Sequence, residues 1–231
     1  MQTLFKTILF GLMAILVPSV MARDLALSAA QSSQPVRILA FGDSLTQGYG
    51  VPPGMEFPAR LEKALNAEGL DVTVINAGVS GETSAGGLAR ADWLLGDGKS
   101  GPDAVILELG ANDGLRGLPV AEMEKNLDMI LSKLKARNIP VLFAGMKGPR
   151  NFGARYAQDY DSVFPKLAMK YDALFYPFFL EGVALDRALV QPDGLHPNPK
   201  GVDVIVKGIE PLAERLVQQA KARRAGVPAK K

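Results

Sequence analysis

The chain has 231 residues, 48% of them hydrophobic and 22% charged, with one histidine and no cysteine. This composition excludes a disordered chain, and the lack of cysteine excludes disulfides, thiolate catalysis and thiolate-held metals. The net charge of +2 conceals an acidic body, because the last 11 residues hold five basic residues and no acidic one. Nucleic-acid binding needs a concentrated basic face, so we expect no nucleic-acid partner.

Residues 1–22 have the three-part pattern of a secretory signal peptide. A basic residue precedes the apolar run Thr7–Val17, and Pro18 ends that run ahead of the small or compact residues Val20-Met21-Ala22. Residues 23–34 are rich in Ala, Ser and Gln and are expected to form a linker. An uncleaved amino-terminal anchor is the alternative, but a membrane span needs about 20 apolar residues. We therefore expect a periplasmic or secreted protein with no stable membrane insertion.

From Pro35 onward, predicted strands alternate with predicted helices. The strands are short apolar runs, and most are continuous rather than alternating in polarity, as in a parallel sheet covered on both faces; they are Val36–Phe41, Val72–Asn76, Ala104–Leu109, Val141–Ala144 and Ala173–Tyr176. The helices show apolar residues at helical spacing and, in two cases, a proline at the start; they cover Phe57–Ala67, a segment from near Thr83, Pro119–Arg137, a segment within Ala154–Lys170, and a final segment from Pro199.

This alternation predicts one α/β domain over residues 35–220. Five strands separated by helices favour a three-layer α/β/α sandwich with a five-stranded parallel sheet and right-handed crossovers. The length is sufficient for a core of its own. Residues 221–231, which include Gly226 and Pro228, are expected to form a basic, disordered tail.

Four polar segments lie where such a sheet would place a site. Three directly follow predicted strands and the fourth precedes the last helix; they are Gly42–Thr46, Ala77–Thr83, Gly110–Gly114 and Asp193–Pro197. Ligands of an open parallel sheet bind beyond the carboxyl ends of its strands. We therefore expect these segments to meet at one rim of the sheet.

Three residues of these segments have the types that a serine hydrolase needs. Ser44 lies on a sharp strand-to-helix turn, and a serine hydroxyl requires a general base within hydrogen-bond reach to act as a nucleophile. His196 is the only histidine and hence the candidate base. Asp193, three residues earlier, can accept from the imidazole Nδ1–H and stabilise the imidazolium. The oxyanion of a tetrahedral intermediate would be bound by the backbone N–H groups of Ser44 and Gly81 and the amide of Asn112.

Other polar residues of the rim are assigned structural roles. Asp43 and Asp113 are expected to tie their loops to backbone amides. Glu108, inside a strand, is expected to be hydrogen-bonded near the rim. Ser80 and Thr83 are candidate caps of the helix that follows them.

The four segments also resemble a known family. The chain is similar to the GDSL, or SGNH, hydrolases, whose four sequence blocks carry Ser, Gly, Asn and His; these letters fall on Ser44, Gly81, Asn112 and His196. The match runs from about Ile38 to the last helix and is nearest to the bacterial arylesterase and thioesterase I/lysophospholipase L1 branch. The resemblance implies a flavodoxin-like SGNH fold, no metal or organic cofactor, a periplasmic monomer, and hydrolysis of aryl, acyl-thio or lysophospholipid esters.

The substrate is left open by the sequence. The acyl site is expected in the loops after Gly78, after Asn112 and around Lys147–Phe152, where Met146 and Phe152 are apolar. A carbohydrate O-deacetylase of the same family is one alternative. A flavin- or nucleotide-binding module is another, because Ser80-Gly-Glu-Thr-Ser-Ala-Gly86 loosely resembles a phosphate-binding turn. Such a module would be coloured or nucleotide-loaded when purified and would not need the Ser44/Asp193/His196 set.

Overall fold

The computed structural model describes residues 34–96 and 101–226. The predicted signal peptide, residues 1–22, and residues 23–33 of the predicted linker lie outside the described residues. Pro35–Lys231 forms one compact unit. None of the helices in the described ranges has both the length and the apolar character needed to cross a membrane.

The core element is a sheet of five parallel strands in the order β2-β1-β3-β4-β5. The strands are β1 (Val36–Gly42), β2 (Val72–Gly78), β3 (Ala104–Glu108), β4 (Val141–Ala144) and β5 (Leu174–Tyr176). The predicted fold class is therefore confirmed. β1 and β2 extend past their predicted ends to Gly42 and Gly78, which are paired with each other across the two strands.

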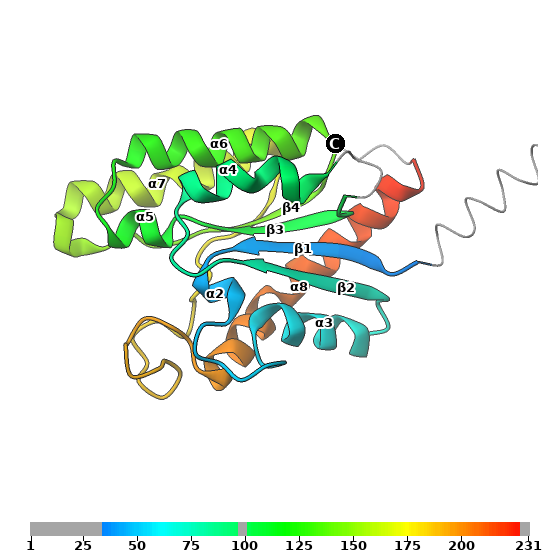
Figure 1. The fold of residues 1–231 in the computed structure, drawn as a ribbon, viewed down its shortest axis with the longest axis horizontal. Helices are drawn as coiled ribbons and strands as arrows, with labels where there is room; N and C mark the ends of the chain where they lie inside the picture. Colours follow the sequence, from blue (N-terminus) through cyan, green and yellow to red (C-terminus); the bar gives the residue numbers. More distant parts are fainter. Residues whose placement is uncertain (1–33, 97–100, 227–231) are drawn as a thin grey trace, which may run out of the picture. The chain divides into compact units, whose positions relative to one another are not determined.

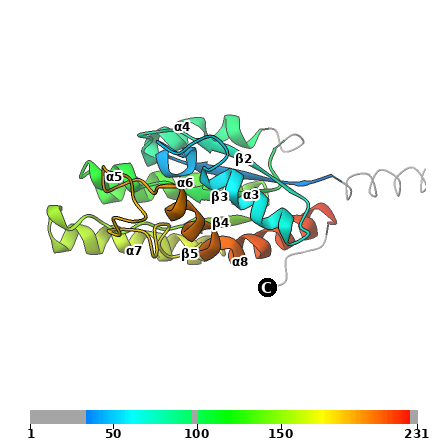
Figure 2. The ribbon, with the colours of Figure 1, turned by 90° about the horizontal axis from the view of Figure 1, so that it is seen from below.

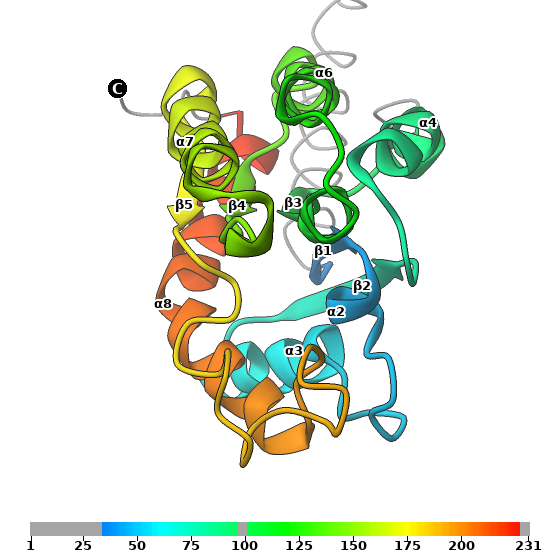
Figure 3. The same cartoon turned by 90° about the vertical axis from the view of Figure 1, so that its left-hand side faces the viewer.

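Helices cover both faces of the sheet (Figure 1). On one face, α3 (Phe57–Ala67) packs against α8 (Pro199–Arg224), and Figure 2 shows this pair from below. On the other face lie α4 (Ser84–Leu95), α6 (Val120–Ala136) and α7 (Ala154–Tyr171). The three layers are seen end-on in Figure 3. The apolar stripes predicted for α6 and α8 are buried except for Val120 and Leu212, which are only partly buried; in α6 the buried residues are Met123, Leu127, Ile130, Leu131 and Leu134.

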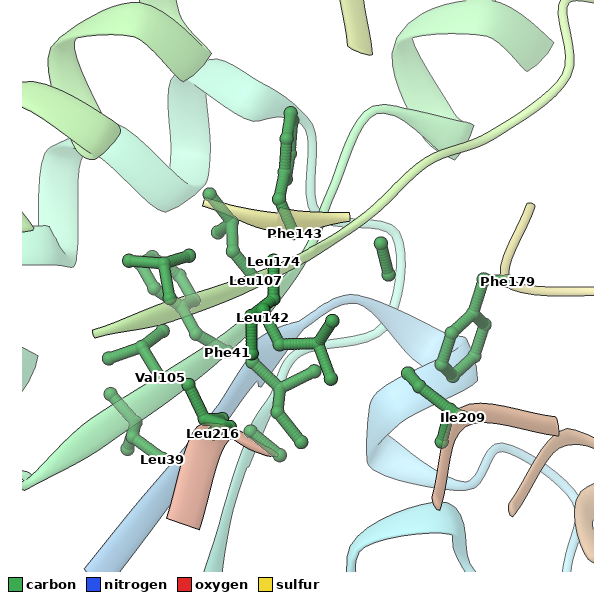
Figure 4. Packing of buried hydrophobic residues seen from close by; sticks show 14 of the residues in the cluster. Leu39, Phe41, Val105, Leu107, Leu142, Phe143, Leu174, Phe179, Ile209 and Leu216 are labelled. Atoms are coloured by element: carbon green, nitrogen blue, oxygen red, sulfur yellow. The ribbon is translucent and has the colours of Figure 1, made fainter. Parts of the chain in front are cut away.

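The interior is built around the central strand β3, all five of whose residues are buried. Phe41, Leu107 and Phe143 are lateral neighbours on β1, β3 and β4 and form one apolar row across the sheet (Figure 4). Phe143 contacts the ring of Phe164 on α7, with the ring centroids 5.5 Å apart. Because the sheet is covered on both faces, β3 and β4 are buried throughout and β1 is exposed only at Arg37, whereas the edge strand β2 has exposed polar residues such as Thr73.

Three short elements were not predicted. They are α2 (Ser44–Gln47), α5 (Ala111–Leu115) and the 3₁₀ turn η1 (Arg150–Phe152). Segments of three to five residues are too short to show a helical period in the sequence. α2 and α5 directly follow β1 and β3, so they start at the carboxyl ends of adjacent strands.

The prediction of a disordered tail from residue 221 onward is wrong for residues 221–224, which are helical. α8 continues through Arg224, and the side chain of Arg224 donates to the Asp103 carboxylate (Nε–Oδ1 2.7 Å) and to the carbonyl of Pro35 (2.6 Å). Tertiary contacts thus extend the helix into a segment whose composition resembled a frayed end. Residues 227–231 lie outside the described part of the chain.

Candidate active site

The four predicted polar segments meet beyond the carboxyl ends of β1, β2 and β3. Figure 3 looks onto this edge, where α2, α5 and the segment preceding α8 face the viewer. The chain passes from β1 to β2 on one side and then crosses β1 to form β3 on the other. The edge is therefore a topological switch point, the place where open α/β sheets bind ligands.

Ser44 is the first residue of α2 and is held by a tightly packed turn. The carboxylate of Asp43 caps the helix by accepting from the backbone N–H of Leu45 at 3.0 Å. A side chain at position 42 would place its Cβ 2.0 Å from Oγ1 of Thr46, so Gly42 is needed for the turn to close. Because Ser44 begins a helix, its own backbone N–H has no acceptor in the preceding turn and remains free to bind an anion.

Ser44, His196 and Asp193 form a continuous hydrogen-bonded chain. Nε2 of His196 lies 2.9 Å from Oγ of Ser44, and Nδ1 lies 2.7 Å from Oδ2 of Asp193. This arrangement requires the tautomer in which Nδ1 carries the proton and donates to the carboxylate. Nε2 then accepts from the serine hydroxyl, which is the geometry of a nucleophile with its general base.

Asp193 is held in its charged form. Its Oδ1 accepts from the backbone N–H groups of Leu195 (2.9 Å) and His196 (3.0 Å). The backbone N–H of His196 has the largest effect on this carboxyl, and these hydrogen bonds lower the pKa of Asp193 to about 2. The carboxylate therefore stays ionised at any pH near neutrality and can stabilise an imidazolium beside it.

The loop that carries the histidine is fixed by Gln191, a residue that the sequence did not single out. Its amide Nε2 donates to the carbonyls of Tyr49 (2.7 Å) and Pro197 (2.9 Å). The Tyr49 ring lies against the imidazole of His196, with centroids 4.7 Å apart. Gln191 and Tyr49 are separated by 142 positions, so only the folded chain shows that they meet.

The two other predicted oxyanion donors lie beside Ser44. Gly81 and Asn112 both line the cavity that contains Ser44 and His196. Nδ2 of Asn112 donates to Oδ2 of Asp43 at 3.0 Å. One N–H of the amide is thereby directed to the carboxylate, and the second N–H of the same group is left to face a ligand.

Two buried acids lie under this turn. Glu108 accepts from Oγ1 of Thr46 at 2.8 Å, while its Oε1 is buried without a partner among the described residues. Burial and then the nearby charge of Asp43 raise the pKa of Glu108 well above its usual value. Burial raises the pKa of Asp43 to about 6. The buried Glu108 therefore favours its protonated form more than an ordinary glutamate does, while the Asp43 carboxylate accepts from the amide of Asn112.

The expected roles of Thr83 and Asp113 are confirmed, whereas Ser80, the other candidate cap, does not cap α4. Thr83 caps α4 by accepting from the N–H of Gly86 at 3.4 Å. The carboxylate of Asp113 accepts from both the backbone N–H (2.8 Å) and the hydroxyl (2.6 Å) of Ser84. A carboxylate thus already occupies the start of α4. A phosphate group would need these same donors, so the geometry does not favour the nucleotide-binding alternative.

The site opens into a largely apolar cavity of about 400 Å³. Met146 lines it, as predicted, whereas Phe152 is not among its lining residues. Leu115 and Pro149 also line it, from the expected segments after Asn112 and around Lys147–Phe152, whereas the sequence did not indicate the apolar walls Tyr49, Phe178, Leu180 and Leu195. In the described part of the chain, no three His, Asp or Glu side chains cluster closely enough to hold a metal ion.

Comparison with known proteins shows the family to which this chain belongs. The model of the GDSL-like lipase/acylhydrolase family matches residues 40–204, and the chain belongs to that family. An arylesterase of Vibrio mimicus is 40% identical over 83% of this chain and 92% of its own length. The thioesterase 1/protease 1/lysophospholipase L1 of Escherichia coli K12 is 38% identical over 76% of this chain and 84% of its own length.

Solved structures agree with this assignment. The SGNH-hydrolase family esterase AlinE4 is 46% identical, with a TM-score of 0.68 over 79% of this chain and 97% of that chain. The psychrotrophic esterase EstA from Pseudoalteromonas, in a structure inhibited by monoethylphosphonate, is 36% identical with a TM-score of 0.74, covering 79% of this chain and 99% of that chain. The expected SGNH hydrolase fold is therefore confirmed.

Proposed function

We propose that the protein is a serine esterase with Ser44 as nucleophile, His196 as general base and Asp193 as the residue that orients the histidine. The observation that carries the proposal is the hydrogen-bonded chain from Ser44 through His196 to Asp193, in which Ser44 and His196 line an apolar cavity. Membership of the GDSL-like lipase/acylhydrolase family supports it, as do the relatives called arylesterase and esterase.

The geometry suits a two-step acyl transfer. Oγ of Ser44 attacks the ester carbonyl while Nε2 of His196 takes the serine proton. The carbonyl oxygen becomes an oxyanion, bound by the backbone N–H groups of Ser44 and Gly81 and the amide of Asn112. The bond to the leaving group then breaks, and the imidazolium returns the proton to that group. Water attacks the acyl-enzyme by the same route, releasing the acid and the free serine.

The substrates that we propose are aryl esters, acyl thioesters and lysophospholipids with an acyl chain in the apolar cavity. Support comes from the cavity walls, which include Leu115, Met146 and Phe178, and from the names of the relatives. A carbohydrate O-deacetylase would need polar groups to bind a sugar and only a small acyl site. We therefore favour esters with acyl chains longer than acetyl.

The test is an acyl-chain profile on one preparation. The rates for acetyl, hexanoyl and longer p-nitrophenyl esters are compared with those for matching thioesters, and Ser44→Ala is compared with wild type. We expect the longer chains to be preferred and Ser44→Ala to abolish turnover with a nearly unchanged melting temperature. The matched control is Ser162→Ala, which removes an exposed serine on α7. Turnover by Ser44→Ala above a tenth of the wild-type kcat would contradict the proposal, and a strict acetyl preference would favour the deacetylase.

We also propose that the mature protein is exported and acts as a monomer. Export rests on the pattern of residues 1–22, which lie outside the described residues. Support for the monomer comes from the triad, whose three residues all belong to one chain.

A further inference from the structure

The two oxyanion donors that flank Ser44 come from separate segments. Gly81 lies in the loop between β2 and α4, and Asn112 lies in α5, after β3. In the sheet, β1 lies between β2 and β3. The backbone of Gly81 has a φ of +75°, and glycine is the residue with the least resistance to rotation. The distance between the two donors therefore depends on contacts between the segments.

Arg116, at the carboxyl end of α5, is bonded to both of these segments. Its guanidinium donates from Nη2 to the carbonyl oxygen of Gly81 at 2.7 Å. Its backbone N–H donates to the carbonyl oxygen of Asn112 at 3.2 Å. One residue is thus hydrogen-bonded to the main chain of both donors.

The other side of the Gly81 loop is held to the sheet. Arg90 of α4 donates from Nε to the carboxylate of Glu82 at 2.7 Å, and from Nη2 to the carbonyl of Ala77 at 2.7 Å. The Arg90 guanidinium also lies over the ring of Phe41, 4.7 Å from its centroid. Arg90 therefore ties the loop to the ends of β1 and β2, and Arg116 ties it to α5.

We infer that Arg116 is a positioning residue, which sets the spacing between the Gly81 and Asn112 donors and so shapes the oxyanion hole. The inference rests on the proposed esterase function. Donors stabilise an oxyanion only if they are already held at its position, so a loosened Gly81 loop weakens binding of the transition state. The ground-state ester is bound mainly by the apolar cavity walls and is affected little. Loss of Arg116 should therefore lower kcat and leave KM nearly unchanged.

A different role for an exposed arginine near a site is attraction of an anionic substrate. Arg116 is not among the residues that line the cavity, which favours the positioning role. The two roles also differ in what they change. A residue that attracts substrate affects KM, and only for anionic esters, whereas a positioning residue affects kcat equally for neutral and anionic esters.

The experiment measures kcat, KM and melting temperature for Arg116→Ala and Arg116→Lys with a neutral and an anionic ester. For Arg116→Ala we expect a loss in kcat of about 10- to 100-fold on both esters, smaller than the loss on deleting a donor outright. KM should stay within about twofold by the same argument. Arg116→Lys keeps one N–H donor within reach of the carbonyl and should recover part of the loss. The matched control is Arg155→Ala, which removes an arginine whose side chain is 96% exposed.

A double variant tests whether Arg116 acts through the oxyanion hole. In an Asn112→Ala background, the further loss caused by Arg116→Ala should be smaller than in wild type, because the spacing between Gly81 and Asn112 no longer matters and only the position of Gly81 relative to the Ser44 N–H remains to be lost. If Arg116→Ala does not melt cooperatively, the same kinetic measurements are made on Arg116→Gln in its place.

Three results would overturn the inference: a wild-type kcat in a folded Arg116 variant, a rise in KM restricted to the anionic ester, or fully multiplicative losses in the double variant. Absence of ester turnover in the wild type itself would be a different result, because it would overturn the proposed function.

Discussion

The reactive side chains of this site each depend on a neighbouring residue for their orientation. His196 is oriented by Asp193, and Asp193 by two backbone N–H groups of its own loop. Asn112 is oriented by Asp43, which also caps the helix of Ser44. Single substitutions can therefore separate effects on kcat from effects on folding stability, because some of these side chains are expected to contact substrate and others only to orient their neighbours.

Asn112→Ala tests the oxyanion hole apart from the nucleophile. Removing one such donor typically lowers kcat by about 10²–10³, or about 3–4 kcal/mol of transition-state stabilisation, and we expect little change in KM. If Asn112 only pinned its loop, the variant would melt several degrees lower while kcat per titrated active site stayed at the wild-type value. Measuring active-site titre, melting temperature and kcat on one sample distinguishes these two results.

Glu108→Gln tests the buried acid under the nucleophile turn. The pKa of Glu108 in the folded protein is raised well above its ordinary value of 4.5. Above pH 4.5 the unfolded chain loses this proton while the folded chain keeps it, so the wild type loses stability as pH rises, by up to about 1.4 kcal/mol per pH unit. Glutamine does not titrate, so the Glu108→Gln variant does not lose stability in this way. The stability of the variant relative to wild type should therefore increase between pH 4.5 and 7.5.

Urea unfolding of both proteins at these two pH values measures the effect. A stability difference that does not change with pH would show that Glu108 is not held in its protonated form. Thr46→Val is a useful companion, because it removes the hydroxyl that donates to Glu108 and leaves the acid itself in place.

At the scale of elements, the short helices α2 and α5 present the proposed nucleophile and an expected oxyanion donor, whereas the long helices bury most of the apolar surface. α2 presents Ser44, while α5 presents Asn112 and ends next to Arg116. Both are four or five residues long and are fixed by hydrogen bonds to neighbouring segments. By contrast, α8 buries apolar residues along most of its length and ends in an ion pair with the loop before β3.

Truncation at two points tests the role of the end of α8. Removing residues 221–231 deletes Arg224 and leaves Asp103, whose side chain is 14% exposed, without this partner. We expect a loss of about 1–3 kcal/mol, between the values for exposed and buried pairs, which corresponds to a melting temperature about 2–10 °C lower. Removing only residues 227–231 is the control and should leave the melting temperature unchanged. Equal melting temperatures for both truncations would contradict a structural role for the end of the helix.

At the scale of the whole molecule, residues 1–22 are expected to direct export and then to be removed. The apolar run is shorter than the length of about 20 residues that a membrane-spanning helix needs. Small or compact residues follow it, as at the cleavage site of a signal peptide. Amino-terminal sequencing of the protein from its native host should therefore begin near Arg23. An intact Met1 on the folded, active protein would contradict export with cleavage and favour the uncleaved anchor.

The sequence alone determined the features that depend on local pattern. Short apolar runs marked all five strands, because a sheet covered on both faces buries nearly every residue of its inner strands. Apolar stripes marked the long helices, and turn residues after β1, β2 and β3 marked the rim. The parallel order of the strands then brings Ser44 and Asn112 to one edge. The family motifs indicated the same residues.

Only the tertiary structure decided the features that depend on contacts between distant residues. Gln191 binds the carbonyl of Tyr49, and Arg116 binds that of Gly81, although nothing in the local sequence links these pairs. The same holds for the cavity walls at Phe178 and Leu180, and for the helical end of α8. In each case the stabilising partner lies in another segment, so the free energy that selects the conformation is supplied only once the chain has folded.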